Sequence, residues 1–340
     1  MADVVAAERV ARHFSIAGPV HGVEPIAAGL VNDTFLVGTN ADAYVLQRIN
    51  RSVFGDPRAL MQNVAMVSAH LAGRHVPELV PSGDGGWIIE DGADIWRMWR
   101  RVRDAAPCGE LTPVRVGSAA QLLGRFHLGL SDLSPSLLTE TIPHFHDLGI
   151  RLASLRETIA HDPCGRVEDV GAEIERAFAA NALVMTATEF TSRLPRQVAH
   201  NDAQINNILF RRDDAVCLVD LDTVMPTARF WDVGDLLRSA STRGEEDDPD
   251  PQHNLVEPAL FHAIVDGYRD AVARVVTPGS IEYAAVEVSG LFITYEQALR
   301  FLTDYLRGDV YYRTTRAGQN LDRARAQLNL LASMQGSVAS

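Results

Sequence analysis

Three oxygen-bearing side chains lie close together in this 340-residue sequence. Asp202 and Asn207 are five residues apart in the stretch 200–207, which reads HNDAQINN, and Asp220 follows in the stretch VDLD. One carboxylate could orient and deprotonate an attacking hydroxyl group, while an amide and a second carboxylate could hold Mg²⁺ on nucleotide phosphates. The residue types and their order therefore predict phosphoryl transfer.

A predicted β-hairpin would position these side chains. Two short apolar runs, 208–210 and 216–219, read as buried strands, and the polar residues between them read as a turn. Asp202 then lies on the loop before the hairpin, Asn207 near the start of its first strand and Asp220 at the end of its second. The three side chains would converge at one end of a small, rigid element.

Two further side chains in this region have expected supporting roles. Asp222 lies two residues beyond Asp220, so both would share one face if the strand continues. There Asp222 could bind a second metal ion or simply hold the loop. His200 is expected to bond to the backbone and hold the loop that carries Asp202, rather than to transfer a proton.

Composition narrows the class of protein. The net charge of −13 argues against a nucleic-acid partner or an anionic membrane surface, and no apolar run approaches the length of a membrane span. The first residues lack the basic and apolar parts of a signal peptide. The three cysteines are far apart and lack metal-ligand spacing, so a reduced, cytoplasmic setting is expected. Nothing in the sequence indicates the oligomeric state.

Periodicity predicts a β-rich part at the start of the chain. Short apolar or alternating runs between Gly, Asn and Asp turns read as strands, and Asp56-Pro57 reads as the start of a helix. The expected order is helix, three strands, helix, two strands. Their ranges are 3–13, 23–28, 34–37, 43–49, 56–73, 87–90 and 95–102. A five-stranded antiparallel sheet with a helix is typical of a protein-kinase-like small lobe, which we assign to residues 1–103.

The remaining residues, 104–340, are expected to form a large, mainly helical lobe that carries the hairpin. The predicted helical stretches are 116–130, 148–193 with a break at Cys164-Gly165, 258–275, 280–307 and 321–334. The acidic, proline-containing stretch 244–254 is expected to be an exposed loop. The predicted fold class is therefore α+β with two lobes.

The spacing H-x-D-x-x-x-x-N at 200–207, followed by a buried strand and V-D-L-D, resembles the aminoglycoside-phosphotransferase-like branch of the kinase superfamily. It departs from protein kinases because no Arg follows His200 and no Phe-Gly follows the second motif's aspartate. The resemblance implies ATP and Mg²⁺ as cofactors, a small-molecule acceptor and Asp202 as the catalytic group. The implied metal ligands are Asn207, Asp220 and Asp222. It also implies that Asp232 accepts backbone N–H groups of the catalytic loop, with an N-cap as the alternative role.

The chain contains no lysine, which affects the expected nucleotide site. Kinases place a lysine on the third strand of the small lobe, where it contacts the nucleotide phosphates. The stretch YVLQR at 44–48 aligns with that strand, so Val45 would face adenine and Gln47 would take the lysine's place. Arg48 would point to the opposite face, and the helix 56–73 has no Glu to pair with a lysine.

Other nucleotide contacts follow from the same resemblance. The turn 29–34 (GLVNDT) resembles a phosphate-covering loop, with Asn32 and Thr34 as additional donors. Its single glycine is also compatible with an ordinary hairpin turn. Arg101 and Val102, where strand gives way to helix, would form the hinge whose backbone bonds the adenine edge.

Four longer stretches resemble the N-acetylhexosamine 1-kinase group within this superfamily. They are GLVNDTF at 29–35, YVLQRIN at 44–50, VDLDTVMP at 219–226 and RFLTDYLRGD at 300–309, so the resemblance extends from about residue 25 to about residue 320. It implies phosphorylation of the anomeric hydroxyl of an N-acetylhexosamine.

A sugar site combines planar hydrogen-bonding groups with an aromatic face. The candidates for contacts to the acceptor are Asp202, Trp231, Arg300, Asp304 and Tyr311. On a helix, Arg300 and Asp304 are four residues apart and share a face, although an ordinary surface ion pair has the same spacing.

Two other functions stay open at this stage. The acceptor could be another small alcohol, such as an amino sugar, aminoglycoside, polyol or amino alcohol, because acceptor residues are scattered along such chains. An aminoglycoside would favour an acidic pocket, for which the stretch 245–250 could serve, although a solvated loop accounts for it equally simply. The missing lysine would also fit a non-catalytic pseudokinase, against which Asp202, Asn207 and Asp220 argue.

Overall fold

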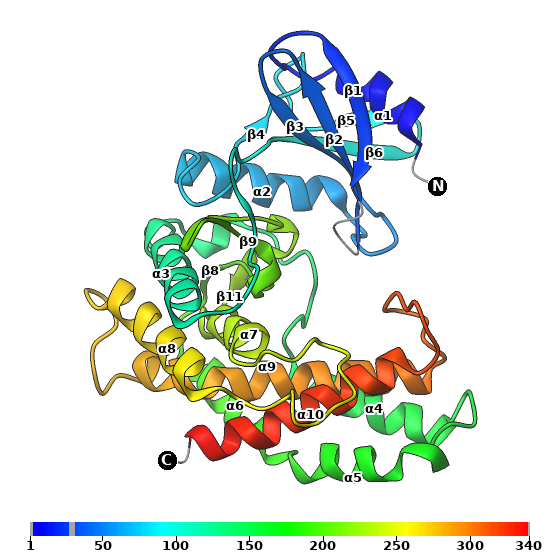
Figure 1. Ribbon diagram of the computed structural model, residues 1–340, viewed down its shortest axis with the longest axis vertical. Helices are drawn as coiled ribbons and strands as arrows, with labels where there is room; N and C mark the ends of the chain where they lie inside the picture. Colours follow the sequence, from blue (N-terminus) through cyan, green and yellow to red (C-terminus); the bar gives the residue numbers. More distant parts are fainter. Residues whose placement is uncertain (1–2, 27–30, 339–340) are drawn as a thin grey trace.

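The computed structural model describes residues 3–26 and 31–338 and has two lobes (Figure 1). A small lobe of strands with α2 beneath it stands over a larger, mainly helical lobe. Residues 27–30, which include the start of the expected phosphate-covering loop, lie outside the described residues. In the part of the chain that is described, no helix is both long and apolar enough to cross a membrane.

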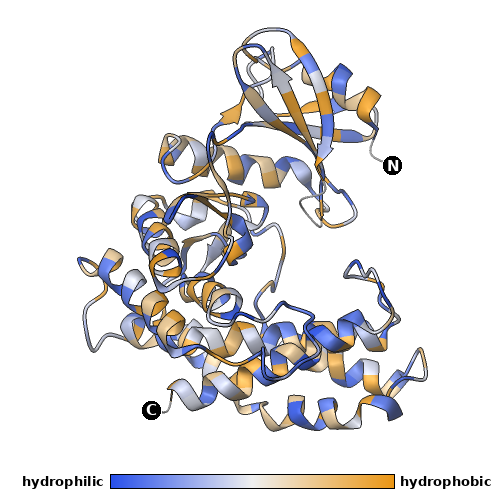
Figure 2. Cartoon of the chain, viewed as in Figure 1, coloured by the Kyte–Doolittle hydropathy of each residue, from blue (hydrophilic) through white to orange (hydrophobic). Residues whose placement is uncertain are grey.

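One antiparallel sheet forms the framework of the small lobe. Its path runs β1-β2-β3-β6-β4, with β5 paired to β6. The strands are β1 (Val20–Ile26), β2 (Asp33–Thr39), β3 (Ala43–Arg48), β4 (Leu79–Val80), β5 (Ile89–Asp91) and β6 (Asp94–Arg100). Figure 2 shows hydrophilic and hydrophobic residues alternating along these strands, the pattern of a sheet with two different faces. The described sheet has six strands rather than the predicted five, because the two-residue β4 is too short to show a period.

Two helices accompany this sheet. Helix α1 (Val4–Ala11) packs in the small lobe's own core with Phe35, Leu46 and Trp96. Helix α2 (Pro57–Leu71) belongs to the apolar core that continues into the large lobe. The predicted start of α2 is confirmed, because Asp56 Oδ1 accepts the N–H groups of Arg58 and Ala59 at 3.0 and 3.1 Å.

The large lobe is built around the 26-residue helix α9, which packs against α4, α7 and α10. Its helices are α3 (Pro113–Gly129), α4 (Leu148–His161), α5 (Gly171–Ala179), α6 (Ala182–Arg193), α7 (Phe230–Ala240), α8 (Pro258–Val272), α9 (Ile281–Leu306) and α10 (Gln319–Val338). The stretch 148–193 is divided into three helices, and α4 ends at the left-handed residue Asp162 (φ 38°), just before the predicted break.

Two small sheets hold the loops that carry the candidate site. The predicted hairpin consists of β9 (Ile208–Arg211) and β10 (Asp214–Leu218), and β7 (Ala106–Pro107) pairs with the other edge of β9. Strands β8 (Gln197–Ala199) and β11 (Met225–Thr227) pair antiparallel. The loop from 200 to 207 therefore runs from one small sheet to the other, and so does the loop from 219 to 224.

Candidate active site

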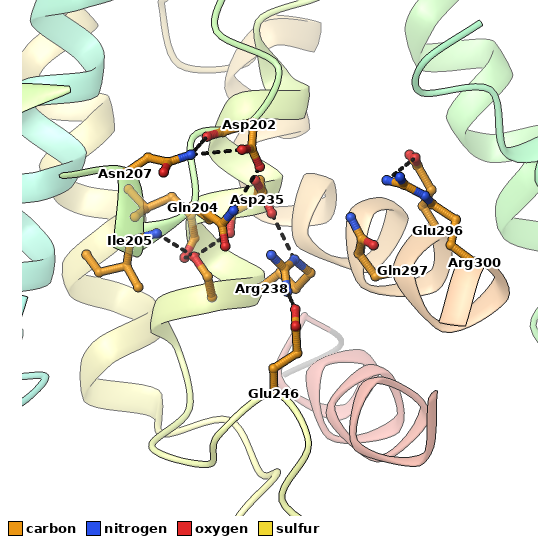
Figure 3. A network of polar contacts seen from close by, with 12 residues as sticks. Asp202, Gln204, Ile205, Asn207, Asp235, Arg238, Glu246, Glu296, Gln297 and Arg300 are labelled. Atoms are coloured by element: carbon orange, nitrogen blue, oxygen red, sulfur yellow. Dashed lines mark hydrogen bonds and ion pairs between the residues drawn. The ribbon is translucent and has the colours of Figure 1, made fainter. Parts of the chain in front are cut away.

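The carboxylate of Asp202 is held by two side chains of its own loop (Figure 3). Asn207 Nδ2 donates to Asp202 Oδ2 and to its backbone oxygen, both at 2.8 Å, and Gln204 Nε2 donates to Oδ1 at 3.1 Å. The amide oxygen of Asn207 consequently points away from Asp202. Gln204 was not among the predicted site residues, although its position two residues after an Asp in a turn favours such a contact.

Asp232, inside helix α7, accepts two backbone N–H groups of this loop. His200 N donates to Oδ2 at 2.7 Å and Asn201 N donates to Oδ1 at 2.6 Å. On its other side, His127 Nε2 lies 2.8 Å from Oδ2, and His127 Nδ1 lies 2.8 Å from the hydroxyl of Tyr268. Burial by itself raises the pKa of Asp232, but His127 and the loop's N–H group lower it below its ordinary value. A fully buried, ionised carboxylate thus fixes the loop's backbone.

The contacts of His200 and the position at which α7 begins bear on the roles expected for His200 and Asp232. His200 Nε2 donates to the backbone oxygen of Val219 at 2.9 Å, so its ring links the two loops. Helix α7 begins at Phe230 with Arg229 at its cap position, and Asp232 lies within its first turn. The alternative in which Asp232 is only an N-cap is therefore wrong.

Two residues of these loops have left-handed backbone conformations, Asn201 (φ 66°) and Asp220 (φ 63°). Such conformations are costly for residues other than glycine and persist where surrounding bonds enforce them. Asn201 Nδ2 donates to the backbone oxygens of Thr223 at 2.9 Å and Met225 at 3.3 Å. The strained backbone turns the neighbouring Asp202 out of the loop while Asn201 fastens the loop to β11.

Asp220 has the chemistry of a ligand for a hard cation. Asp220 is exposed, but the surrounding protein atoms reduce the hydration of its carboxylate. This loss of hydration and the nearby carboxylates of Asp222 and Asp202 raise the pKa of Asp220 to about 8. A divalent cation would relieve that repulsion. Among the described residues no three His, Cys, Asp or Glu side chains converge on one metal position. The residues present therefore fit an ion held by Asp220 and the free amide oxygen of Asn207, with other ligands from phosphate and water.

Asp222 is engaged by the small lobe. The strand ends at Leu218, so the expected strand face shared by Asp220 and Asp222 does not form, and Asp222 lies in a short 3₁₀ turn. Its buried carboxylate forms an ion pair with Arg97 Nη1, and Oδ2 accepts from Asn32 Nδ2 at 2.7 Å. The sequence left open a second metal ion or a role in holding the loop; the contacts instead connect Asp222 to the small lobe.

Gln47, which was expected to take the place of the lysine, contacts an arginine of the neighbouring strand. The two residues are partners in the β3–β6 register, and Gln47 Oε1 accepts from Arg97 Nε at 3.0 Å and from Trp99 Nε1 at 2.9 Å. Gln47 therefore orients Arg97, whose buried guanidinium group pairs with Asp222. The available signal was an Arg between Trp96 and Met98 in a predicted strand, since a charge among large apolar side chains needs a partner.

The remaining residues of the expected phosphate loop connect to the same network. Asn32 Oδ1 accepts from the backbone N–H of Asn50 at 3.0 Å while its amide reaches Asp222. The hydroxyl of Thr34 lies 3.4 Å from Gln47 Nε2. Asn32 and Thr34 thus stand at the junction of the lobes, with their polar groups already engaged by protein.

The predicted hinge follows β6. Arg101 N donates to the backbone oxygen of Ala43 at 2.9 Å, so this N–H is not free for a ligand. Val102 is half-buried, and both residues line a cavity of about 610 Å³ beside the hinge. Val45 is half-buried and is the register partner of Trp99, so it shares the face on which Gln47 and Arg97 lie.

Arg300 does not form the predicted pair with Asp304. Its nearest carboxylate is that of the buried Glu296, 3.9 Å away, one turn before it on α9. Its guanidinium group lies over the rings of Phe145 at 5.8 Å, Tyr311 at 5.7 Å and Tyr312 at 5.4 Å. Cation–π contacts and a long ion pair with Glu296 therefore hold this arginine.

The carboxylate of Asp304 is used within the fold. It accepts the backbone N–H groups of residues 310–312 at 2.8 to 3.1 Å and the side-chain amide of Asn320 at 2.9 Å. Only 4% of the residue is exposed. The expectation that Asp304 contacts the acceptor does not agree with this geometry, because an i, i+4 spacing cannot show which partner a buried carboxylate chooses.

The two aromatic candidates differ in exposure. Trp231 is 2% exposed and stacks on His146, with the ring centroids 5.0 Å apart and the planes at 15°. It lines a cavity of about 360 Å³ together with Phe145 and Met225. Tyr311 is 62% exposed beside Arg300. Of the two, Tyr311 offers the more open ring face.

A second arginine, not predicted from the sequence, lies near Asp202. Arg238 on α7 donates from Nε to Asp235 Oδ1 at 2.8 Å and from Nη1 to Glu246 Oε1 at 3.0 Å. Glu246 comes from the acidic stretch 244–254, which was expected to be a solvated loop but is tied to the helices by such pairs. Its carboxylates are thus partly neutralised by arginines of the large lobe.

Figure 3 shows Asp202, Gln204 and Arg238 on one side of a space and Gln297 and Arg300 of α9 on the other. Both arginines lie near enough to Asp202 for their charges to interact with it. A cavity of about 510 Å³ extends from Gln204 and Arg238 towards the acidic stretch. A hydroxyl-bearing molecule placed here would meet Asp202 at one end and neutral and cationic hydrogen-bond donors around it.

Comparison with known proteins identifies the family of the chain. The model of the phosphotransferase enzyme family, APH, matches residues 22–275, which is most of the chain. The chain therefore belongs to that family and is a phosphotransferase that acts on small molecules carrying a hydroxyl group. Over 264 residues it is 24% identical to homoserine kinase of Zymomonas mobilis subsp. mobilis, covering 75% of this chain and 74% of that protein.

Solved structures of low sequence identity share the fold. An aminoglycoside phosphotransferase from Alicyclobacillus acidocaldarius superposes with a TM-score of 0.65 at 16% identity, covering 97% of this chain and 96% of the other. A spectinomycin phosphotransferase in complex with ADP and spectinomycin gives 0.67 at 9% identity, covering 98% of both chains. These similarities confirm the predicted α+β, kinase-like fold with two lobes.

Proposed function

We propose that the protein uses ATP and Mg²⁺ to phosphorylate a sugar, most specifically the anomeric hydroxyl of an N-acetylhexosamine. Residues 1–103 would bind the nucleotide, and residues 104–340 would carry the catalytic loop and the acceptor, in a cytoplasmic setting. The single observation that carries the proposal is the arrangement in Figure 3, where Asp202, Gln204 and Arg238 lie opposite Gln297 and Arg300 of α9. The ADP in the spectinomycin phosphotransferase of the same fold supports an adenine nucleotide.

The charges around the acceptor space argue for a neutral, hydroxyl-rich acceptor. Arg238 is paired with Asp235 and Glu246, and Arg300 lies beside Glu296, so these carboxylates already have cationic partners. A polycationic aminoglycoside would have to compete with the two arginines for the same carboxylates. A sugar would instead use the amide and guanidinium groups for hydrogen bonds and the exposed ring of Tyr311 for its apolar face.

The chain's own residues account for the transfer step. Asp202 orients the acceptor hydroxyl and takes its proton as the oxygen bonds to the γ-phosphorus, while the bond from phosphorus to the bridging oxygen breaks and ADP leaves. Asn207 and Asp220 hold Mg²⁺, which when bound neutralises charge on the phosphates. Arg97, oriented by Gln47, adds the positive charge that a lysine gives in other kinases.

A second acceptor class has one specific observation in its favour. Arg300 and Arg238 could bind the carboxylate of an amino-acid alcohol, and the relative from Zymomonas mobilis is a homoserine kinase. The two acceptors differ in charge: an amino-acid alcohol needs the positive charge of these arginines, whereas a neutral sugar needs only their hydrogen bonds. Loss of the Arg300 charge would abolish recognition of a carboxylate but only weaken the binding of a neutral sugar.

An ADP-release screen would test the proposal. The panel comprises N-acetylglucosamine, N-acetylgalactosamine, glucosamine, homoserine, choline and kanamycin, with Asp202→Asn as the inactive control. Phosphorus NMR of the product should show a phosphate on the anomeric carbon of an N-acetylhexosamine. A clear preference for homoserine would replace the sugar with the second acceptor class, and preference for kanamycin would contradict the charge argument.

A further inference from the structure

A buried histidine connects helix α9 to the catalytic loop. His146 lies in the segment before α4, and its side chain is 7% exposed. Its Nδ1 lies 2.9 Å from Glu296 Oε2, and its Nε2 lies 3.1 Å from the backbone oxygen of Asn201, the residue before Asp202. Trp231 covers the ring in a nearly parallel stack. The ring is thus fixed in plane and at both nitrogens.

The two partners determine how many protons the ring carries. A backbone oxygen can only accept a hydrogen bond, so Nε2 must carry a proton. Glu296 Oε2 also accepts when the carboxylate is ionised, so Nδ1 must then carry a second proton. The alternative, a protonated Glu296 beside a neutral His146, is disfavoured because Arg151 and Arg300 lie 3.8 and 3.9 Å from Glu296 Oε1. The geometry therefore fits an imidazolium ring that donates in both directions.

The surrounding charges also favour a protonated His146 beside an ionised Glu296. Burial by itself lowers the pKa of His146, but Glu296 on α9 and Asp235 and Asp232 on α7 raise it above the ordinary value. Burial likewise raises the pKa of Glu296, yet His146, Arg300 and Arg151 bring it below the ordinary value. The charged groups that face this pair are Arg151 of α4, Asp232 and Asp235 of α7, and Arg300 of α9.

We propose that His146 is a positioning residue that holds the carbonyl of Asn201, and thereby Asp202, while both of its ring nitrogens carry protons. When the ring loses one proton, the other stays on Nδ1 beside the Glu296 carboxylate, which is a stronger acceptor than a backbone oxygen, and Nε2 no longer donates to Asn201. The inference rests on the proposed role of Asp202 in phosphoryl transfer. It differs from the support given by Asp232, which accepts hydrogen bonds from N–H groups of the same loop. Asp232 would hold the loop at all working pH values, whereas His146 would release it as pH rises through its own pKa.

The protonation state can be measured without any acceptor. In a protein labelled with ¹⁵N at the histidine rings, the His146 signal is identified by its loss in His146→Gln. We expect both ring nitrogens to be protonated at pH 7 and one proton to leave at a midpoint above that of an exposed histidine. Glu296→Gln should lower this midpoint. A ring with one protonated nitrogen at pH 6 would overturn the proposal.

Hydrogen exchange followed by mass spectrometry tests the link to the loop. His146→Gln should speed exchange in peptides covering 198–207 but leave the hairpin 208–218 unchanged, and wild-type protein should show the same change as pH rises, after correction for intrinsic exchange. His144→Gln is the matched control, because His144 is two residues away and its side chain is 66% exposed. Equal exchange in both variants would overturn the proposal even if no acceptor had been found.

Kinetics complete the test once an acceptor is known. We expect His146→Gln to lower kcat by roughly 10- to 100-fold with little change in KM for ATP, because a small displacement of the base suffices for such a loss. The alkaline decrease of kcat attributed to His146 should be absent from this variant. If His146→Gln and His144→Gln have the same kcat, the loop does not depend on His146. If no acceptor in the panel is turned over, the proposed function fails while the two acceptor-free measurements still decide this inference.

Discussion

Two buried aspartates serve the active site in different ways. Asp232 lies wholly within the large lobe, where His127 and two backbone N–H groups of the catalytic loop surround it. Asp222 belongs to the large lobe but is held by Arg97 and Asn32 of the small lobe. Asp232 fixes a loop within the large lobe, whereas Asp222 connects the two lobes.

We therefore expect Asp232 to control the position of Asp202, and Asp222 to control how the nucleotide is bound between the lobes. Disturbing Asp232 should misplace Asp202 and affect the chemical step. Disturbing the Asp222–Arg97 pair should change how the lobes meet around the phosphates and affect nucleotide binding. The variants below, in order of decreasing effect, test whether the two aspartates can be distinguished in this way.

Asp202→Asn should have the largest effect. The amide keeps the shape of the side chain but cannot accept the hydroxyl proton, so kcat should fall by roughly 10³-fold or more. ATP binding, measured by calorimetry, should stay close to that of the wild type. A near-normal kcat would show that Asp202 is not the base and would remove the reason for treating its loop as the catalytic one.

Asp232→Asn should reduce both activity and stability. An amide can accept only on its oxygen side, so one loop N–H loses its acceptor, and the buried contact with His127 loses its charge. Breaking a buried charged contact costs about 3 kcal/mol. We expect denaturant unfolding to show such a loss, with kcat reduced more than the affinity for ATP. The opposite ratio would contradict the proposed division of roles.

Arg97→Met should mainly affect the nucleotide. Methionine keeps most of the apolar contact but leaves Asp222 as a buried carboxylate without its cation. KM for ATP should rise by about tenfold, equivalent to about 1.4 kcal/mol, with a smaller change in kcat. The double variant Arg97→Met, Asp222→Asn should regain stability over the single one. If it does not, the ion pair is not what joins the lobes.

Gln47→Ala should have a smaller effect on nucleotide binding than Arg97→Met, because Gln47 orients Arg97 without carrying a charge itself. We expect a few-fold rise in KM for ATP. Asp220→Ala, which removes a proposed ligand of Mg²⁺, should cost far more, and the two can be compared directly in a magnesium titration. A greater loss from Gln47→Ala than from Asp220→Ala would mean that Gln47 contacts the phosphates itself.

Arg48→Gln should have the smallest effect. Arg48 neighbours Gln47 on β3 but faces the other side of the sheet, where it pairs with Asp33 and Asp94. These carboxylates are partly exposed, so the loss should be about 1 kcal/mol or less. Both KM for ATP and kcat should match the wild type. A kinetic effect as large as that of Gln47→Ala would show that strand alternation does not decide access to the nucleotide.

The local parts of the site could be predicted from the sequence because they depend on residues only a few positions apart. The hairpin, the loop with Asp202 and Asn207, and the cap of α2 at Asp56 follow from periodicity and turn residues within a few positions. The family resemblance of the two motifs then predicted the fold that the comparisons confirm. Strand β4 escaped prediction because two residues between loops carry no period.

The non-local parts could not be read in the same way. Asp304 has the right spacing to pair with Arg300, yet it binds the backbone of residues 310–312, because a buried carboxylate takes whichever donors the fold brings to it. His146 and Glu296 are 150 positions apart in the chain, and no local pattern indicates their contact. The same is true of Arg97 and Asp222.

The sequence by itself determined which groups are available for chemistry: an aspartate, an asparagine and a second aspartate in fixed order, and no lysine anywhere. Tertiary structure alone decided which cation pairs with Asp222 and which donors the carboxylate of Asp304 accepts. The physical reason is that a buried charge must find an opposite charge or a hydrogen bond, and that partner is chosen by proximity in space rather than by distance along the chain.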